Sequence, residues 1–113
     1  MPIKIIKDKI TLDELKILAK ERYGDMVKVV LDIEKEIMAA GAEMHVDEEQ
    51  LLLENGSEQK NLWGINLYPD GKEFVEFDSM INIRPWQHNR SRGVEDKDTQ
   101  NKIKKIIDKL VDK

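Results

Sequence analysis

The chain has 113 residues, of which 40% are hydrophobic and 37% are charged, and its net charge is −4. This length and composition predict a single domain over residues 1–113 with one small core. The absence of cysteine excludes a disulfide scaffold, a thiolate zinc site and a cysteine nucleophile. No apolar run approaches the roughly 20 residues that span a membrane, and the charged start over residues 1–7 does not fit a signal peptide. We therefore expect a soluble cytoplasmic protein with no membrane partner.

Charge is distributed unevenly along the chain. Residues 32–58 carry nine acidic side chains and one basic one, whereas residues 97–113 carry six basic and three acidic side chains. A nucleic-acid-binding protein usually has a concentrated basic face, and the basic excess here is small and mixed with aspartate. The charge pattern therefore argues against a nucleic-acid partner.

The start of the chain predicts a short strand followed by a helix. Residues 3–6 are rich in isoleucine, which favours a strand. Thr11 fits the N-cap of a helix, because Glu14 stands three residues later and can complete a capping box. Gly24 can end this helix in a left-handed conformation. The predicted helix therefore spans about 11–23.

Residues 26–40 allow two interpretations. Their apolar residues fit a helical stripe, and those from 27 to 33 also alternate as in a strand. The valine-rich start favours strands, so we predict two of them, joined by a turn at 34–36. The alternating stretch 42–46 is predicted to be extended, and a short helical turn is expected over about 47–53.

The second half of the chain predicts a hairpin and a final helix. Residues 62–68 and 74–84 alternate as strands on either side of Pro69-Asp70-Gly71, where proline fixes φ and glycine accepts a positive φ. A polar loop is expected over 85–95. The apolar residues between Ile103 and Val111 then follow helical spacing. Together these elements predict an α+β fold, in which a mainly antiparallel sheet has an N-terminal and a C-terminal helix packed on one face.

Three polar side chains alternate in the stretch that is predicted to be extended. Glu43, His45 and Asp47 would share one face of a strand, where they could bind a divalent metal with His88 as a further ligand. They could also serve as base and orienting group in acid–base catalysis. The spacing is not diagnostic, because the polar faces of strands often produce such triplets. A solvated face is the simpler interpretation, and no cofactor is predicted beyond this candidate metal.

A second group of candidates lies in the polar loop: Arg84, His88, Asn89, Arg90 and Arg92. Guanidinium groups bind phosphate or carboxylate through paired hydrogen bonds, so this loop is a candidate site for a small anionic ligand or a partner. In the alternative interpretation, the arginines pair with the acidic segment 32–58 of the same chain.

The polar side of the predicted hairpin supplies a third group: Asn66, Tyr68, Glu76 and Asn82. If the helices cover the apolar face of the sheet, this polar face stays open and could bind a protein partner or a second copy of the chain. The simpler interpretation is the solvated side of an ordinary antiparallel sheet.

Three blocks of sequence carry a resemblance to a known family: LWGINLYP at 62–69, FDSMINIRP at 77–85 and NRS at 89–91. The chain resembles a family of small uncharacterised prokaryotic proteins classed as a domain of unknown function. This resemblance implies one compact domain and supplies no activity, cofactor or site residue.

The sequence leaves three functions open. The most favoured is a small binding or interaction module that uses the open polar face and the loop 84–93, and that also self-associates or binds a protein partner. The alternative is a small metal-assisted or acid–base enzyme for an anionic substrate, which requires His45 and the arginines to converge on one pocket. The third is a regulator that contacts nucleic acid. The familiar nucleotide-binding and hydrolase motifs are missing from the sequence, which favours the binding module.

Overall fold

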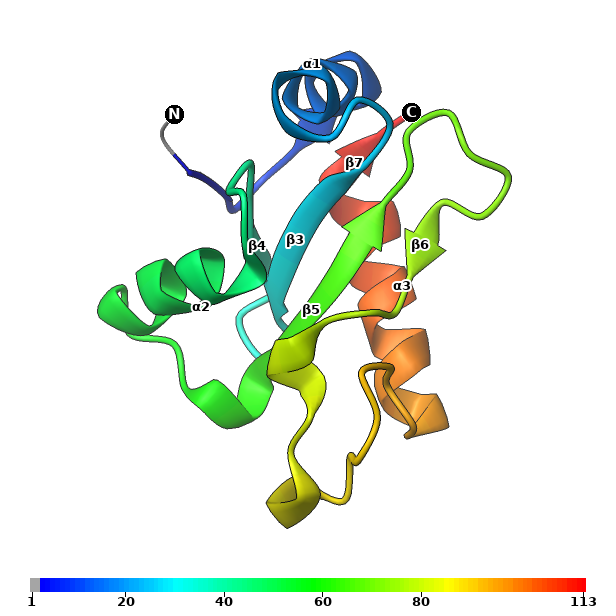
Figure 1. Ribbon diagram of the computed structural model, residues 1–113. Coiled ribbons are helices and arrows are strands. Elements are labelled where there is room, and N and C mark those ends of the chain that lie inside the picture. Colours follow the sequence, from blue (N-terminus) through cyan, green and yellow to red (C-terminus); the bar gives the residue numbers. More distant parts are fainter. Residues whose placement is uncertain (1–2) are drawn as a thin grey trace.

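The computed structural model describes residues 3–113, so Met1 and Pro2 of the predicted domain lie outside the described residues (Figure 1). Its helices are α1 (Leu12–Arg22), α2 (His45–Glu54) and α3 (Lys97–Leu110), and its strands are β1 (Lys4–Ile6), β2 (Ile10–Thr11), β3 (Val27–Asp32), β4 (Ile37–Ala40), β5 (Leu62–Leu67), β6 (Val75–Glu76) and β7 (Val111–Asp112). Short 3-10 helices, η1 (Gln59–Asn61), η2 (Met80–Asn82) and η3 (Pro85–Gln87), lie in the connections.

Five of the strands form one antiparallel sheet in the order β1-β4-β3-β5-β6. The short strands β2 and β7 pair in parallel and bring the end of α3 beside the start of α1. The predicted α+β class, with a mainly antiparallel sheet, is therefore confirmed. No helix within residues 3–113 is both long enough and apolar enough to cross a membrane.

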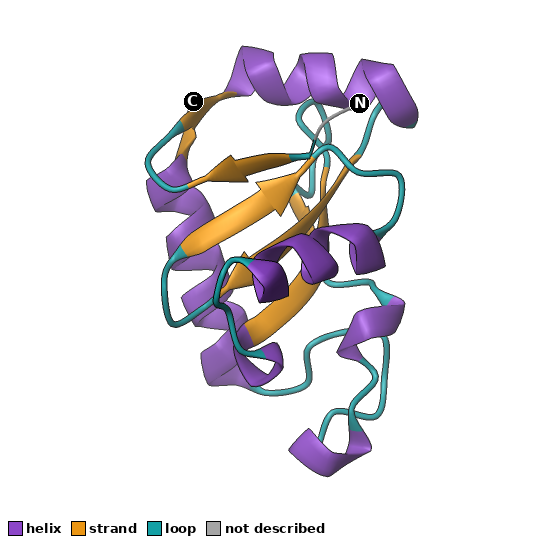
Figure 2. Ribbon diagram, turned by 90° about the vertical axis from the view of Figure 1, so that its left-hand side faces the viewer, coloured by secondary structure: helices purple, strands orange, loops and turns teal. Residues whose placement is uncertain are grey.

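Helices pack against both faces of this sheet. Val29 of β3 belongs to a hydrophobic cluster that includes Leu15 of α1 and Ile107 of α3. The next residue, Val30, belongs to a second cluster with Leu52 of α2. Because successive side chains of a strand point to opposite faces, the two clusters lie on opposite sides of the sheet, and Figure 2 shows α2 in front of the strands and α3 behind them. The face that was expected to be open is thus partly covered by α2.

Local signals in the N-terminal half determine the observed elements. The Thr11 side chain accepts a hydrogen bond from the amide of Glu14 (3.1 Å), and the Glu14 carboxylate accepts one from the amide of Thr11 (3.2 Å). This capping box confirms the predicted start of α1.

Asp32 explains why residues 26–40 form two strands, since its Oδ1 accepts hydrogen bonds from the amides of Glu34 and Lys35, both at 2.9 Å. These bonds close the turn between β3 and β4.

Two predicted elements are wrong. Residues 42–46 are not a strand, because α2 already begins at His45, and burial of Leu52 against the sheet favours this helix over the alternation seen in the sequence. The return strand over 74–84 is reduced to β6, which pairs only Asn66 with Glu76 and Leu67 with Val75.

An asparagine side chain replaces the rest of that return strand. Asn82 Oδ1 accepts a hydrogen bond from the amide of Gly64 (2.8 Å), and Asn82 Nδ2 donates to the carbonyl of the same glycine (2.9 Å). A carboxamide offers one donor group and one acceptor, as a backbone unit of a strand does. Asn82 therefore pairs with β5 in place of a strand while the surrounding chain, including η2, curls away.

Candidate functional site

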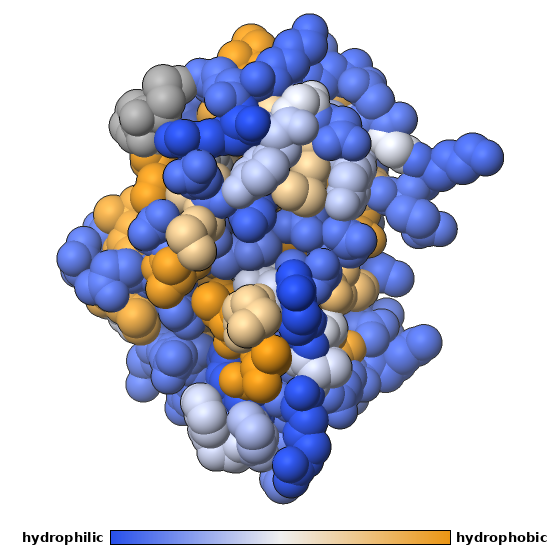
Figure 3. All heavy atoms as spheres, in the orientation of Figure 1, coloured by the Kyte–Doolittle hydropathy of each residue, from blue (hydrophilic) through white to orange (hydrophobic). Residues whose placement is uncertain are grey.

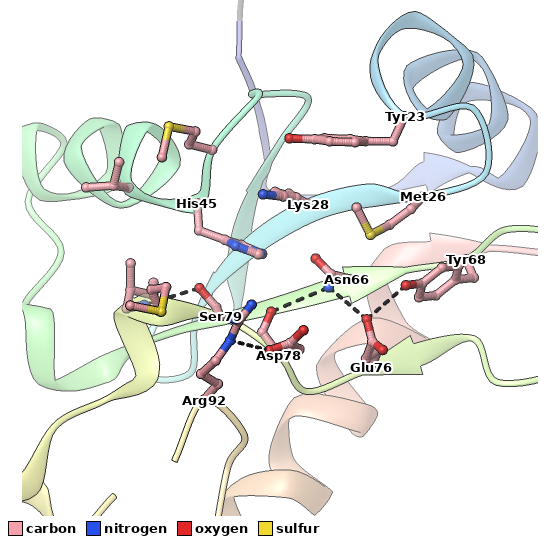
Figure 4. Close-up of a pocket in the computed structure, with 14 residues that line it drawn as sticks. Tyr23, Met26, Lys28, His45, Asn66, Tyr68, Glu76, Asp78, Ser79 and Arg92 are labelled. Atoms are coloured by element: carbon pink, nitrogen blue, oxygen red, sulfur yellow. Dashed lines mark hydrogen bonds and ion pairs between the residues drawn. The ribbon is translucent and has the colours of Figure 1, made fainter. Parts of the chain in front are cut away.

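A cavity of about 410 Å³ opens on the α2 side of the sheet, between β5, α2 and the segment that follows β6 (Figure 4). We call it the central cleft. Its main polar residues are Lys28, His45, Asn66, Glu76, Asp78 and Arg92. Exposed large side chains surround them and form what we call the apolar rim: Tyr23, Met44, Val46 and Met80.

The floor of the central cleft is a network on β5 and β6. Asn66 and Glu76 are register partners, and Asn66 Nδ2 donates to Glu76 Oε1 at 2.8 Å and to the carbonyl of Asp78 at 3.4 Å. The hydroxyl of Tyr68 donates to the same Glu76 oxygen at 2.9 Å. Asn66 is only 5% exposed, and its Oδ1 has no hydrogen-bond partner within residues 3–113. The floor thus contains a buried acceptor without a donor.

His45 enters the cleft from the first position of α2. Its Nε2 lies 2.7 Å from the carbonyl of Ile65, and because a carbonyl only accepts, Nε2 carries the proton. Burial lowers the pKa of His45 below its ordinary value, and the nearby charges of Lys28 and Arg92 act in the same direction. The imidazole is therefore neutral at pH 7, with an unprotonated Nδ1.

The walls of the cleft hold two cations, each of which contacts a group of this chain. Arg92 Nε donates to Asp78 Oδ1 at 2.7 Å. Lys28 Nζ lies 5.1 Å from the centroid of the Tyr23 ring, within the range of a cation–π interaction. The hydrogen bond to Glu76 is the largest cause that raises the pKa of Tyr68, and burial and the charges of Glu76, Asp25 and Asp78 act in the same direction. Asp78 also acts on His45 and is paired with Arg92. Apart from that ion pair, Lys28 acts on His45 while Glu76 and Asp25 act on Tyr68, so we call the part of the cleft at Tyr68 its acidic end.

Gly64 allows the cleft wall to approach the sheet. A Cβ atom on Gly64 would lie 2.5 Å from Ser79 Cβ and 3.2 Å from His45 Cδ2. The first separation is too short for any real contact, so only glycine lets Ser79 and His45 rest on β5 at this position. This requirement gives a physical reason for the glycine in the LWG sequence.

The structure brings together part of each predicted group. His45, Asn66, Tyr68, Glu76 and Arg92 all line the central cleft. Glu43 and Asp47 are not among the residues that line it, because the helical start of α2 separates side chains that a strand would align. Within the described part of the chain, no group of three or more His, Asp or Glu residues could hold a metal ion.

Arg84 stabilises the loop that contains it. Its guanidinium donates through all three nitrogens, to the carbonyls of Ile81 (2.9 Å), Gln59 (2.8 Å) and Leu62, and to Gln87 Oε1 (3.2 Å). It also lies 4.4 Å from the centroid of the Trp63 ring. With 1% of its surface exposed, this guanidinium has no face left for an external anion.

Asn89 likewise closes the polar loop. Its Nδ2 donates to the carbonyls of Asn82 (2.7 Å) and Gly93 (2.8 Å), and its Oδ1 accepts from the amide of Glu95 (2.8 Å). His88, which has a positive φ of 61°, lines a separate cavity of about 490 Å³ beside Trp63. Arg90 is exposed, so of the five loop candidates only Arg92 lines the central cleft.

The acidic segment 32–58 does not pair with these arginines. Among residues 3–113, the ion pair of the loop joins Arg92 to Asp78, and no ion pair links Arg84, Arg90 or Arg92 to a carboxylate of that segment. Glu49 lies close enough to Arg84 to act on its pKa without forming an ion pair.

Sequence reasoning missed several residues of the cleft. Lys28 was seen as a member of an alternating strand and not as a site residue, although it is the register partner of Asn66. The methionines of the apolar rim gave no signal, because exposure of an apolar side chain depends on tertiary packing. Only knowledge that α2 is a helix would have placed Met44 and Val46 beside Met80.

Fold and site together define a small α+β protein with a mixed polar and apolar cleft on one side of an antiparallel sheet. The chain belongs to the family described as "Protein of unknown function (DUF5674)", whose model matches residues 4–110. No curated protein and no solved structure matches the chain.

Proposed function

We propose that this protein is an interaction module that binds a partner protein at the central cleft. One observation carries the proposal. Of the six large apolar side chains exposed within residues 3–113, four surround this single cleft: Tyr23 (40% exposed), Met44 (54%), Val46 (48%) and Met80 (66%). Scattered apolar side chains on a surface need no explanation, whereas a contiguous group around a cavity is typical of an interaction site.

The surface of the cleft has the composition of a recognition site. Figure 3 shows the face that carries the cleft, with orange side chains gathered left of its centre directly beside hydrophilic ones in blue. Methionine side chains adapt to the shape of a partner because they are unbranched and polarisable. Buried polar groups at the floor then provide specificity, since a wrong partner leaves them without hydrogen bonds.

The arrangement supports binding over catalysis. The enzyme alternative required His45 to meet the basic loop and a carboxylate pair in one pocket. Arg92 is the loop arginine that lines the cleft, and it is engaged by Asp78. The proton of His45 is held by a backbone carbonyl, which positions the ring without activating it as a carboxylate would.

A partner of different sequence fits the cleft better than a second copy in a symmetric dimer. A two-fold interface uses the same surface patch on both sides, and the cationic donors of this patch, Lys28 and Arg92, already contact Tyr23 and Asp78 of their own chain. A partner of different sequence can supply a free donor to the buried acceptor Asn66 Oδ1. The lack of cysteine, which suits a reducing compartment, leads us to propose that this binding occurs in the cytoplasm.

Site-specific photo-crosslinking tests the proposal. A photoreactive phenylalanine analogue is placed at Val46 or Met80 on the apolar rim, or at the exposed control position Ile17 on α1, in the natural host cell. We expect one discrete adduct from the two rim positions and not from Ile17. The purified partner is then tested against the variant Met44→Ser/Met80→Ser, which should bind at least about tenfold more weakly, the loss of roughly 1.4 kcal/mol.

Three results would contradict the proposal. The first is the absence of adducts from both rim positions. The second is an adduct that forms equally from Ile17, and the third is a purified partner that binds the double serine variant as well as the original chain. An adduct between two copies of this chain, with a dimer in sedimentation experiments, would replace the partner protein with self-association.

A further inference from the structure

Resting on the proposed function, we infer that the partner inserts a basic side chain, lysine or arginine, into the acidic end of the central cleft, where it donates hydrogen bonds to Asn66 Oδ1 and Glu76. The chemistry of this side chain follows from the polar groups that the cleft leaves without partners.

The orientation of the Asn66 amide is fixed by its neighbours. Its Nδ2 faces two acceptors, Glu76 Oε1 and the carbonyl of Asp78, so the amide cannot be reversed without placing oxygen against oxygen. The opposite atom, Oδ1, therefore points toward the space between His45 and Met26, as Figure 4 shows. Since Asn66 is almost completely buried and Oδ1 has no donor among the described residues, the cleft has a place for a hydrogen-bond donor.

The neighbouring carboxylate makes a charged donor the best match. Glu76 uses one oxygen, Oε1, for both Asn66 and Tyr68. Within residues 3–113 its second oxygen has no hydrogen-bond partner, so it remains available to an ammonium or guanidinium group. A donor with several N–H groups can reach both acceptors at once, and hydrogen bonds between charged groups are about twice as strong as neutral ones.

The cations of the cleft do not occupy this place. Arg92 is bound to Asp78, and Lys28 points away from Asn66, toward α2, with Tyr23 above it (Figure 4). Asp78 acts on both His45 and Tyr68 and is paired with Arg92, whereas Glu76 and Asp25 act on Tyr68. A basic side chain at the Asn66–Glu76 end would therefore meet the carboxylates of Glu76 and Asp25.

The apolar surroundings fit the rest of such a side chain. Met26 lies beside Asn66 at the same end of the cleft (Figure 4) and offers a contact for the aliphatic stem of lysine or arginine, which packs on apolar surface while its head is bound. The exposed Met44 and Met80 would then contact neighbouring residues of the partner.

Short peptides with matched central residues test this inference. The probes are acetylated and amidated tripeptides with lysine, arginine, norleucine or glutamate between two alanines, titrated into the full isotope-labelled chain. Amide shifts are followed at 65–67 and 76 and on the Asn66 side chain. We expect saturable shifts with the lysine and arginine peptides, and binding at least about tenfold weaker with norleucine, which has nearly the same stem without the charge.

Two variants, each without one carboxylate, distinguish binding at this site from nonspecific electrostatic attraction between the peptide and the chain. Glu76→Gln keeps an acceptor for Asn66 and Tyr68 but removes the charge, and we expect it to weaken binding of the lysine peptide about tenfold. Glu58→Gln removes an exposed carboxylate that does not line the cleft and should leave binding unchanged. Equal losses in the two variants, or preferred binding of the glutamate or norleucine peptide at the cleft, would overturn the inference, as would the absence of shifts with every peptide.

The crosslinking experiment fails or succeeds independently of this one. A partner that is crosslinked from Val46 and Met80, combined with a cleft that rejects basic peptides, would retain the interaction module and discard the basic side chain. Failure of both experiments would discard the two proposals together.

Discussion

Arg84 shows how a residue that is typical of ligand binding can be committed entirely to the fold. Its guanidinium joins the start of η1, the start of β5 and η2 through one backbone carbonyl of each element. Planar geometry with donors in several directions is what distinguishes arginine from lysine in such a place. The sequence block that ends in Asn-Ile-Arg-Pro is thereby explained by loop architecture and not by anion binding.

Replacement of this arginine should destabilise the protein even when the charge is kept. We expect Arg84→Lys to lower the free energy of unfolding by about 3 kcal/mol, because an ammonium cannot reach three divergent carbonyls and leaves buried acceptors without donors. Urea unfolding followed by circular dichroism measures the change. Arg90→Lys, at an exposed position, serves as the control and should stay within about 0.5 kcal/mol. Equal stability of the two variants would show that the observed hydrogen bonds of Arg84 contribute little.

At the scale of single elements, α2 places ionisable groups against the sheet. Glu48 is fully buried, with Oε2 bonded to the amide of Ala42 (3.0 Å) and Oε1 without a partner among the described residues. Burial raises the pKa of Glu48 well above its ordinary value of 4.5, against the attraction of Lys28. Burial also lowers the pKa of His45, in the first turn, below 6.5. The helix therefore packs best when both side chains are neutral.

The raised pKa of Glu48 makes the free energy of unfolding fall as pH rises, and the lowered pKa of His45 makes it fall as pH falls. Above about pH 4.5 the unfolded chain releases the Glu48 proton while the folded chain retains it, so stability falls as pH rises toward the folded pKa. We expect Glu48→Gln to remove this loss. The stability of the variant relative to the original chain should then increase between pH 5 and pH 8, by at most about 1.4 kcal/mol per pH unit.

His45 supplies the matched comparison on the acidic side. Below pH 6.5 the unfolded chain binds a proton that the folded chain does not, so stability falls as pH falls. His45→Gln should flatten this acidic slope and leave the slope above pH 7 unchanged, as measured by chemical denaturation at a series of pH values. Parallel pH profiles for the original chain and both variants would contradict the assigned protonation states.

The same helix marks the limit of sequence-based prediction at this scale. The capping box of α1, the turn at 34–36 and the spacing of α3 are local signals, and the structure confirms each of them. Residues 42–46 alternate as a strand would, but the burial of Leu52 against Val30 stabilises a helix from His45 onward. Prediction failed where a contact between distant residues outweighs a local pattern, and the central cleft depends on that same contact.

At the scale of the whole molecule, the fold has a well-paired sheet and a long segment that is held by side chains. Strands β1, β4, β3 and β5 make continuous backbone ladders. Residues 77–93, by contrast, join the sheet through side chains: the carboxamide of Asn82 bonds Gly64, Arg84 donates to the carbonyl of Leu62, and Asn66 donates to the carbonyl of Asp78 (3.4 Å). Because this segment supplies Asp78, Met80 and Arg92 to the cleft, its attachment to β5 determines whether the binding surface exists. No pattern in the sequence distinguishes such a segment from a strand, which is why Asn82 was predicted as a site residue.

Removal of the Asn82 side chain should therefore loosen this segment while the sheet remains folded. In Asn82→Ala we expect amide hydrogen exchange to accelerate at Gly64 and across 79–93 by about tenfold or more, because the two hydrogen bonds to Gly64 and the one to the carbonyl of Arg92 are lost. Protection of β3 and β4 should change little, since their ladders do not involve Asn82. Asn101→Ala, at an exposed position on α3, provides a control with the same change of side chain. Uniform acceleration over the whole chain would mean that the segment and the sheet unfold as one unit, and that the side-chain attachment is not a separate element of the fold.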